Sequence, residues 1–262
     1  MMATQADARS FDHRAEHFDR FAELVGGPLD EFIDSQIPHG GGGRAVDLGC
    51  GTGRHAALLA NRYQHVVAVD VSTQMLDVAK ARRGLPNIAY QHRDLGGVRA
   101  DTDGTFDLVL SAYALHHVDD LDPTLEGIRE LVAPGGRAIL IDNVDPRGRV
   151  SRRRLWKEAI HILAGDLIKR RRSSEEAWEL FGLNTDPDWL RHLISDRFPT
   201  PEQFTQRYGA VFPGAAFTEL YRARALCWTC PTGTPAGQAR RERSAPTPRG
   251  EPTSGEQAGN PA

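Results

Sequence analysis

A glycine-rich turn between an apolar strand and a helix constrains this sequence more than any other feature. The turn reads Asp47-Leu48-Gly49-Cys50-Gly51-Thr52-Gly53 and follows a strand-like run that ends at Leu48. Glycines in such a turn let the backbone bend sharply and lie against a ligand, because no Cβ atom stands in the way. The next apolar run ends in Asp70, about 20 residues after the first glycine, where a carboxylate can bind two ribose hydroxyls. These residues predict a nucleoside site at the carboxyl ends of two neighbouring strands.

The spacing of the glycines bears on which nucleoside binds. A dinucleotide fingerprint has the pattern G-x-G-x-x-G, whereas the glycines here stand at 49, 51 and 53 and Arg54 takes the place of the third. The bulk of Arg54 argues against close helix–strand packing around a pyrophosphate. Asp47 would also put a negative charge where a diphosphate should lie. The turn therefore favours a ligand that carries an ammonium or sulfonium cation.

Strand-like and helix-like segments alternate through the first half of the chain. Strands are expected at 44–48, 66–70, 88–92, 106–112 and 137–143, and helices at 54–62, 72–83 and 122–131. Ser72 is the expected N-cap of the second helix, and the turn Pro134-Gly135-Gly136 leads into the last strand. Apolar strands separated by amphipathic helices predict a parallel sheet covered on both faces. Two short helices, broken at Gly26-Gly27-Pro28, precede it.

The pattern changes after Asp145. Residues 147–196 are helical in character and rich in arginine, a helix begins at Thr200-Pro201-Glu202, and strand-like runs follow at 216–221 and 223–230. We expect the arginine-rich segment to form a helical cap over the carboxyl edge of the sheet. Its apolar positions make it amphipathic; they are Trp156, Ile160, Ile162, Leu163 and Leu167. The expected domain spans 11–230, between disordered ends at 1–10 and 231–262.

Five segments resemble, in order, the class I S-adenosylmethionine-dependent methyltransferases, especially their type 11 group. The glycine-rich turn resembles motif I of that family. Val69-Asp70-Val71-Ser72 with Met75 resembles its ribose-binding strand end, and Arg93-Asp94-Leu95 resembles its adenine-contacting segment. Residues 106–111 with Leu115-His116-His117 resemble its fourth strand and the following loop, and 131–136 resemble the turn before its fifth strand. The resemblance covers 11–145 and the closing hairpin. It implies an α/β, doubly wound, Rossmann-like sheet of seven strands in the order 3-2-1-4-5-7-6, strand 7 antiparallel, with a helical N-terminal lid.

The resemblance also implies S-adenosylmethionine as the cofactor and assigns residues to its methionine part. Asp47 would lie near the ammonium group, and the carbonyl of Ser111 would accept a hydrogen bond from it. The turn residues expected along the methionine part are Gly49, Cys50, Gly51 and Gly53.

For the adenosine part, the resemblance assigns Asp70 to the ribose hydroxyls and places the adenine between Val71 and Met75. Asp94 would accept a hydrogen bond from the adenine amine, and the Leu95 N–H would donate to a ring nitrogen. Simpler roles stay open. Asp70 could cap the following helix, although Ser72 already serves there, and Asp94 could be an ordinary loop acid.

His116 and His117 lie where an acceptor would meet the methyl donor, so that one of them could act as a general base; the pair could equally be loop structure. No metal site is expected. His13 and His17 share a helix face, but no third ligand is evident, which favours a lid face. Cys227-Trp228-Thr229-Cys230 stands at a strand end rather than at a helix start, which argues against redox or zinc chemistry.

Charge and hydropathy limit the expected partners. A net charge of -3 gives no global attraction to nucleic acid or to an anionic membrane. No apolar stretch is long enough to span a bilayer, residues 1–10 lack the apolar core of a secretory signal, and an odd number of cysteines, 3, fits a reducing cytoplasm. We therefore expect a cytoplasmic enzyme with no membrane partner, and the oligomeric state is left open.

The expected reaction is methylation of an O, N or C nucleophile of a small organic molecule, in specialised metabolism. Two alternatives remain. One is an RNA or protein methyltransferase that docks through the arginine-rich segment 147–172; a solvated helix face is favoured there, because the aromatic interleaving of single-strand binders is absent. The other is a non-methylating protein that keeps the cofactor site.

Overall fold

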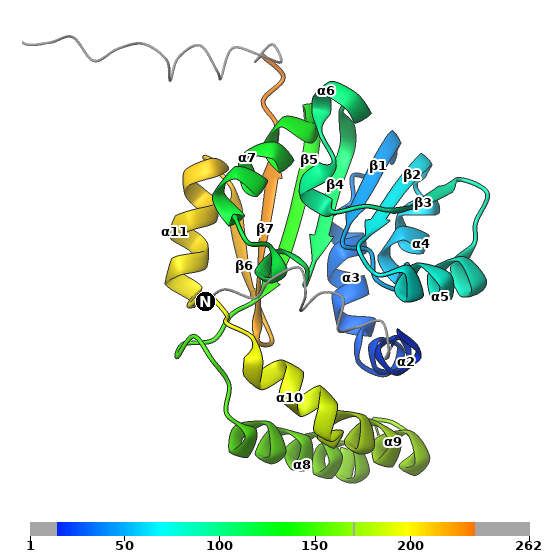
Figure 1. Ribbon diagram of the computed structural model, residues 1–262, viewed down its shortest axis with the longest axis vertical. Helices are drawn as coiled ribbons and strands as arrows, with labels where there is room; N and C mark the ends of the chain where they lie inside the picture. Colours follow the sequence, from blue (N-terminus) through cyan, green and yellow to red (C-terminus); the bar gives the residue numbers. More distant parts are fainter. Residues whose placement is uncertain (1–14, 170, 234–262) are drawn as a thin grey trace, which may run out of the picture.

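A seven-stranded sheet forms the centre of the computed structural model, which describes residues 15–169 and 171–233. Its strand order is β3-β2-β1-β4-β5-β7-β6 (Figure 1). Strands β1 to β5 run parallel to one another, and β7 is antiparallel to both β5 and β6. The bounds are β1 Gly42–Leu48, β2 Tyr63–Asp70, β3 Ile88–His92, β4 Phe106–Ala112, β5 Val132–Asn143, β6 Ala216–Leu220 and β7 Ala223–Thr229. The predicted strand order and the antiparallel seventh strand are confirmed.

Helices cover both faces of this sheet. Before and between the strands lie α2 Ala15–Val25, α3 Gly27–Gln36, α4 Arg54–Ala60, α5 Thr73–Arg83, α6 Ala100–Asp103 and α7 Leu121–Leu131. After β5 come α8 Arg152–Lys169, α9 Ser174–Thr185, α10 Pro187–Ser195 and α11 Pro201–Val211, and two 3-10 turns are η2 Leu95–Gly97 and η3 Leu115–His117. Helices α7 and α11 pack on one face, and α3, α4 and α5 on the other. In residues 15–169 and 171–233, no helix is both long and apolar enough to cross a bilayer.

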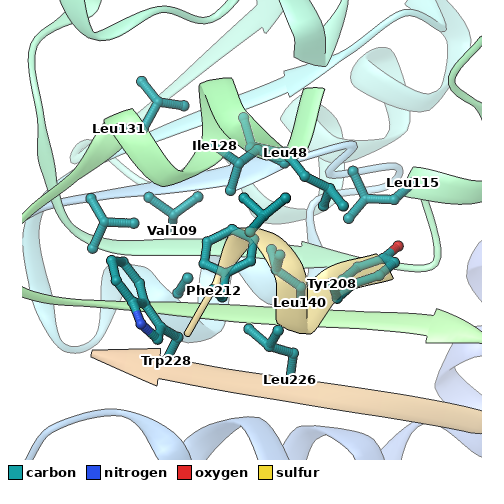
Figure 2. Packing of buried hydrophobic residues seen from close by; sticks show 14 of the residues in the cluster. Leu48, Val109, Leu115, Ile128, Leu131, Leu140, Tyr208, Phe212, Leu226 and Trp228 are labelled. Atoms are coloured by element: carbon teal, nitrogen blue, oxygen red, sulfur yellow. The ribbon is translucent and has the colours of Figure 1, made fainter. Parts of the chain in front are cut away.

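The two cores explain why the central strands are apolar at nearly every position. Along β4, Val109 packs into the core beneath α7 and α11, whereas its neighbours Leu108 and Leu110 pack into the core beneath α3 and α4. Successive side chains of a strand point to opposite faces, so a strand buried on both sides needs apolar residues throughout. Figure 2 shows the first core, with Phe212 and Trp228 against Val109 and Leu140.

Local signals placed most element ends. Ser72 caps α5, since its Oγ accepts a hydrogen bond from the Met75 N–H at 3.1 Å. Strand β5 begins earlier than expected. Val132 already pairs with Phe106, and the ladder resumes at Arg137 opposite Leu108. The predicted turn Pro134-Gly135-Gly136 is thus an excursion within the paired segment, and Gly135 makes it possible with φ 79°.

The chain leaves the sheet after β5 and returns at α11. Helices α8, α9 and α10 lie together below the sheet in Figure 1, and a small core that contains Leu155, Leu190 and Phe198 joins α8 to α10. This arrangement differs from the expected cap in one respect. Of the apolar positions that made the segment amphipathic, Trp156, Ile160 and Leu167 are exposed, because α8 packs inward through Leu155, Ala159 and the ion-paired Asp166. The expected disordered ends, 1–10 and nearly all of 231–262, lie outside the described residues.

We expect Phe212→Ala to destabilise the protein strongly. The Phe212 side chain is fully buried and contacts Trp228 at a ring separation of 5.4 Å. Removing such a ring leaves a cavity and costs about 3–5 kcal/mol of unfolding free energy, which urea denaturation would measure. Tyr221→Ala is the matched control, because Tyr221 is 75% exposed and should change stability by less than about 0.5 kcal/mol. Equal losses in the two variants would contradict this view of the core.

Candidate active site

A cavity of about 400 Å³ opens where the parallel strands end. The turn after β1 forms one wall, and the segments that follow β2, β3 and β4 form the others. Helices α2 and α3 contribute apolar side chains, namely Phe18, Phe21, Ala22, Val25 and Leu29. Ligands of doubly wound sheets bind at this edge, where crossovers on opposite faces leave a crevice.

The three turn glycines hold left-handed backbone conformations for different reasons. Gly49, Gly51 and Gly53 have φ of 76°, 51° and 79°. A Cβ on Gly49 would lie 2.3 Å from the Ala114 Cβ, and one on Gly53 would lie 2.4 Å from the Tyr90 hydroxyl. Around Gly51 the described residues leave more space, because the nearest atom to a Cβ there is on Phe18 at 3.7 Å. Packing therefore requires glycine at 49 and 53, while Gly51 presents bare backbone to the cavity.

Asp70 ties the end of β2 to this turn. One carboxylate oxygen accepts from the Gly51 N–H at 2.8 Å, and the other accepts from the Ser72 N–H at 2.9 Å. The side chain that caps α5 is Ser72, as expected, and Asp70 holds the residue before the helix. Each carboxylate oxygen can accept more than one hydrogen bond, and Asp70 lines the cavity. Its carboxylate can therefore support the turn and accept from ligand hydroxyls at once.

Asp47 carries an unsatisfied acceptor behind the turn. Its side chain is buried, and among the described residues no donor reaches its Oδ2. Burial raises the pKa of Asp47 to about 6, and the charge of Asp70 acts in the same direction. A buried acceptor without a partner is costly, so an ammonium group placed near it would be favoured. Asp47 lies outside the set of residues that line the cavity, as does Gly53.

The adenosine-binding residues implied by the resemblance come together at the other end of the cavity. Val71, Met75, Asp94 and Leu95 all line it. Asp94 also has a structural role, because its Oδ1 accepts from the Gly96 N–H at 2.7 Å and caps η2. The simpler reading of Asp94 as a loop acid and the reading as an adenine contact are thus compatible.

The end of β4 contributes other residues than Ser111 to the cavity, and the contact of the Ser111 carbonyl stays a prediction. Ser111 is fully buried, and its hydroxyl donates to the Leu48 carbonyl at 2.9 Å, which links β4 to β1. The residues of this segment that line the cavity are the next three, Ala112, Tyr113 and Ala114. Tyr113 has φ 60°, a conformation that costs a bulky residue energy and that clusters at functional sites. Burial raises its pKa to about 12, so its hydroxyl is neutral.

His116 and His117 lie in η3, side by side, with their ring centroids 3.9 Å apart. His116 is buried, and its Nδ1 lies 2.5 Å from the Asp142 Oδ1. Burial alone would lower its pKa, but the Asp142 carboxylate outweighs burial and raises it. For His117, burial lowers the pKa, and the nearby His116 and His192 lower it further. Only His117 of the pair lines the cavity. Its lowered pKa favours the neutral imidazole, which can accept a proton but is a weaker base than an ordinary histidine.

Ion pairs that the sequence analysis missed hold α2 over the cavity. The Asp19 carboxylate is fully buried and accepts from Arg82 at 2.5 Å and from Arg83 at 2.7 Å, which joins α2 to α5. On the other side, Arg20 pairs with Glu179 of α9 at 2.7 Å. The helical spacing of Phe18 and Phe21 was visible in the sequence, whereas these pairs join residues too distant in the chain for spacing to reveal.

The remaining motifs have no site of their own in the described part of the chain. The His17 ring packs near that of Trp189, with the two ring centroids 6.1 Å apart. Its expected partner His13 lies outside the described residues. Neither there nor elsewhere in residues 15–169 and 171–233 do three or more histidine, cysteine or acidic side chains form a group able to hold a metal ion. Cys227 and Cys230 are free thiols of the β7 segment, and burial raises the pKa of Cys227 to about 11.

The sheet with its antiparallel seventh strand and the cavity at its edge define a Rossmann-like methyltransferase fold. This chain belongs to the class I S-adenosylmethionine-dependent methyltransferase family. A family described as "Methyltransferase domain" matches residues 45–136. An uncharacterized methyltransferase of Mycobacterium tuberculosis is 30% identical over 206 residues, which cover 77% of this chain and 94% of the relative.

More distant comparisons agree on the fold. The ubiquinone/menaquinone biosynthesis C-methyltransferase UbiE of Desulfotalea psychrophila is 31% identical over 144 residues, 53% of this chain and 58% of the relative. The solved structure of the DhpI–SAH complex superposes with a TM-score of 0.59 at 20% identity, over 88% of this chain and 97% of that one. At that identity the likeness shows the fold alone.

Asp47 gives a test of the site's electrostatics without any ligand. Because its pKa is higher in the folded chain than in the unfolded one, its carboxylate costs stability as pH rises from about 4 to about 6. Between pH 4 and pH 7 the unfolding free energy of the wild type should therefore fall by about 2 kcal/mol relative to Asp47→Asn. Urea denaturation at both pH values measures this difference. Parallel pH profiles for the two proteins would contradict the assignment.

Proposed function

We propose that this protein transfers the methyl group of S-adenosylmethionine to an O, N or C nucleophile of a small organic molecule, in specialised metabolism in the cytoplasm. The observation that carries the proposal is one cavity that joins Gly49 and Gly51 of the turn, the Asp70 and Asp94 carboxylates and the His117 imidazole. Family membership supports methyl transfer, and solved complexes of the same fold, DhpI–SAH and DhpI–SAM–HEP, support the cofactor. We assign residues 11–230 to one domain, with 147–196 as its helical cap.

The residues of the site fit the groups of this cofactor. The Asp70 carboxylate would accept from the ribose hydroxyls, and Val71 and Met75 would bracket the adenine, whose amine would donate to Asp94. The methionine part would follow the bare backbone of Gly51, which has the space that a side chain would fill. Its ammonium group would supply the donor that the buried Oδ2 of Asp47 lacks among the described residues. The Ser111 carbonyl stays a predicted contact of the same group.

The reaction needs positioning more than proton chemistry. The cofactor, when bound, supplies a methyl group already activated on a sulfonium. Phe18 and Phe21 of α2 would close the cavity and keep water from the nucleophile. Where the nucleophile is a hydroxyl or a protonated amine, His117 would take its proton, and Asp142 would fix His116 behind it.

The acceptor part of the cavity is apolar. Once the polar wall is assigned to the cofactor, the surfaces left for an acceptor come chiefly from Phe18, Phe21, Val25, Leu29 and Tyr113. Such a lining favours a small apolar or aromatic molecule. The names of relatives point the same way, since they include a demethylmenaquinone methyltransferase of Clavibacter sepedonicus and a ubiquinone biosynthesis O-methyltransferase of Xylella fastidiosa.

Cofactor binding is tested through Asp70. Asp70→Ala removes two charge-assisted hydrogen bonds to the ribose, so calorimetry should show about a 10- to 100-fold weaker affinity for S-adenosylmethionine. Asp101→Ala is the matched control, because Asp101 is exposed and does not line the cavity. A circular dichroism spectrum like that of the wild type would show that Asp70→Ala is folded. Unchanged affinity in that folded variant would overturn the ribose assignment.

Methyl transfer is tested with methyl-labelled cofactor and an extract of cell metabolites. Label should appear in a small molecule; label in RNA or protein would favour the docking alternative, and binding without any labelled product would favour a non-methylating protein. For an acceptor that carries a proton at neutral pH, His117→Gln should slow labelling about 10²- to 10⁴-fold without lowering the affinity for the cofactor. The exposed His65 offers the control His65→Gln. An equal rate in both variants would remove His117 as the base.

A further inference from the structure

Helix α8 turns an apolar and basic surface away from the rest of the protein. Seven large apolar side chains are exposed among the described residues, and five of them lie on α8 and α9. They are Trp156, Ile160, Leu167, Ile168 and Trp178. Ile160 is 54% exposed and Ile168 is 80% exposed, values unusual for isoleucine. In Figure 1 both helices lie at the edge of the molecule, on the far side of α10 from the sheet.

These side chains form one continuous surface. Trp156, Ile160 and Leu167 recur at the spacing of a single helix face, and Ile168 lies about 100° further round the helix. The buried Leu155, Ala159 and Asp166 lie about 100° round in the other direction. Trp178 joins the surface through Phe181, whose ring lies 5.8 Å from that of Trp178 and 6.1 Å from that of Trp156. We call this surface, together with the cations beside it, the α8 face.

The charged side chains that α8 itself exposes are all cations, whereas α9 exposes the acid Glu175 three residues before Trp178. The exposed cations of the α8 face are Arg152, Arg153, Lys157, Lys169 and Arg171, and none of them makes an ion pair with any described residue. The two acids of α8 are turned inward: Glu158 pairs with Arg154 at 2.9 Å and with Arg222 at 2.7 Å, and Asp166 pairs with Arg172 at 2.7 Å. Although the net charge of the protein is -3, α8 exposes cations and turns its acids inward.

We propose that the α8 face binds the surface of an anionic phospholipid membrane, with the helix lying in the plane of the headgroups. Indole and aliphatic side chains would enter the boundary between headgroups and acyl chains, while the arginines and lysines would meet lipid phosphates. No acid on α8 opposes this contact, because both are held inside by ion pairs. The expectation of no membrane partner came from the net charge, which does not report how the charges are distributed.

The same chemistry argues against two other occupants. A second copy of this chain meeting the first through a two-fold axis would bring the α8 cations against each other. RNA would satisfy the cations and could stack on an indole, but it offers no partner for Ile160, Leu167 and Ile168. An anionic bilayer satisfies both the charge and the aliphatic surface.

The α8 face lies close to the cavity. Helix α10 packs against α8 and α9. On its other side, Trp189 contacts Phe21 at 5.4 Å, and His192 stacks on His117 at 5.8 Å. One helix layer thus separates the membrane-facing surface from the cavity. Membrane binding would bring an apolar acceptor dissolved in the bilayer close to the cavity. This benefit rests on the proposed function, whereas membrane binding itself does not.

The experiment is sedimentation of the full chain with vesicles. Vesicles of equal parts phosphatidylcholine and phosphatidylglycerol should carry the protein down, vesicles of phosphatidylcholine alone should not, and high salt should release it. Trp156 and Trp178 should shift their fluorescence to shorter wavelength on binding, because Trp189 and Trp228 are already buried.

Two variants separate the charge from the apolar surface. Arg152→Ala/Arg153→Ala/Lys157→Ala should lower the vesicle partition coefficient about 100-fold, at roughly fivefold for each cation lost. Ile160→Ser/Ile168→Ser should also lose binding, because the inserted side chains are gone. The controls are Lys80→Ala, an exposed cation on α5, and Tyr221→Ser, an exposed apolar side chain, which should bind vesicles as the wild type does.

Each result decides the proposal. An unchanged melting temperature and unchanged cofactor affinity would show that the variants fold and that the α8 face is separate from the cofactor site. Loss of vesicle binding in both test variants and in neither control supports the membrane surface. The proposal is overturned if the wild type fails to bind anionic vesicles, or if test and control variants bind alike. It is also overturned if the α8 variants abolish RNA binding or dimerisation while vesicle binding is absent.

Discussion

The hydrogen bond from the Gly51 N–H to Asp70 holds the site together. It joins the ends of β1 and β2 at the point where the chain must turn sharply into α4. Gly49 and Gly53 have no room for side chains, so the turn follows a path that requires glycine at both positions. The path of the turn fixes one wall of the cavity. Because Ala114 packs closely against Gly49, the position of the turn also restricts the segment after β4. A carboxylate that satisfies backbone donors in this way is already oriented before a ligand arrives, which lowers the entropy cost of binding.

The fold was largely readable from the sequence because its signals are local. Apolar runs of strand length, glycine turns and N-caps such as Ser72 each depend on a few neighbouring residues, and the alternation of strands and helices restricts the topology. The resemblance supplied the strand order. The boundary furthest from its expected position, at the start of β5, concerned a turn whose position was right. The paired segment continues past that turn because Val132 meets Phe106 across the sheet, a contact that spacing along the chain cannot show.

The site was predictable only where it follows strand ends. Asp70, Asp94 and the turn glycines could be placed because the carboxyl ends of parallel strands meet at one edge. The closing helix was harder. Asp19 is an acid on an otherwise unremarkable helix, and only the fold brings it to Arg82 and Arg83. The pairing of His116 with Asp142 is of the same kind, since it separates the roles of two adjacent histidines that look equivalent in the sequence. The arginine-rich segment was misread, because four large apolar residues of α8, among them Trp156 and Ile160, are exposed.

The ties on either side of α2 make the cover over the cavity a shared element. Asp19 anchors it to α5 of the sheet layer, whereas Arg20 with Glu179, and Arg172 with the Leu24 carbonyl at 2.6 Å, anchor it to the α8–α9 hairpin. A motion that frees the cavity must either break the Asp19 pairs or carry the hairpin along with α2. Loading the donor and positioning the outer hairpin are thus mechanically linked. A displacement of the α8–α9 hairpin would therefore move α2 and change access to the cavity.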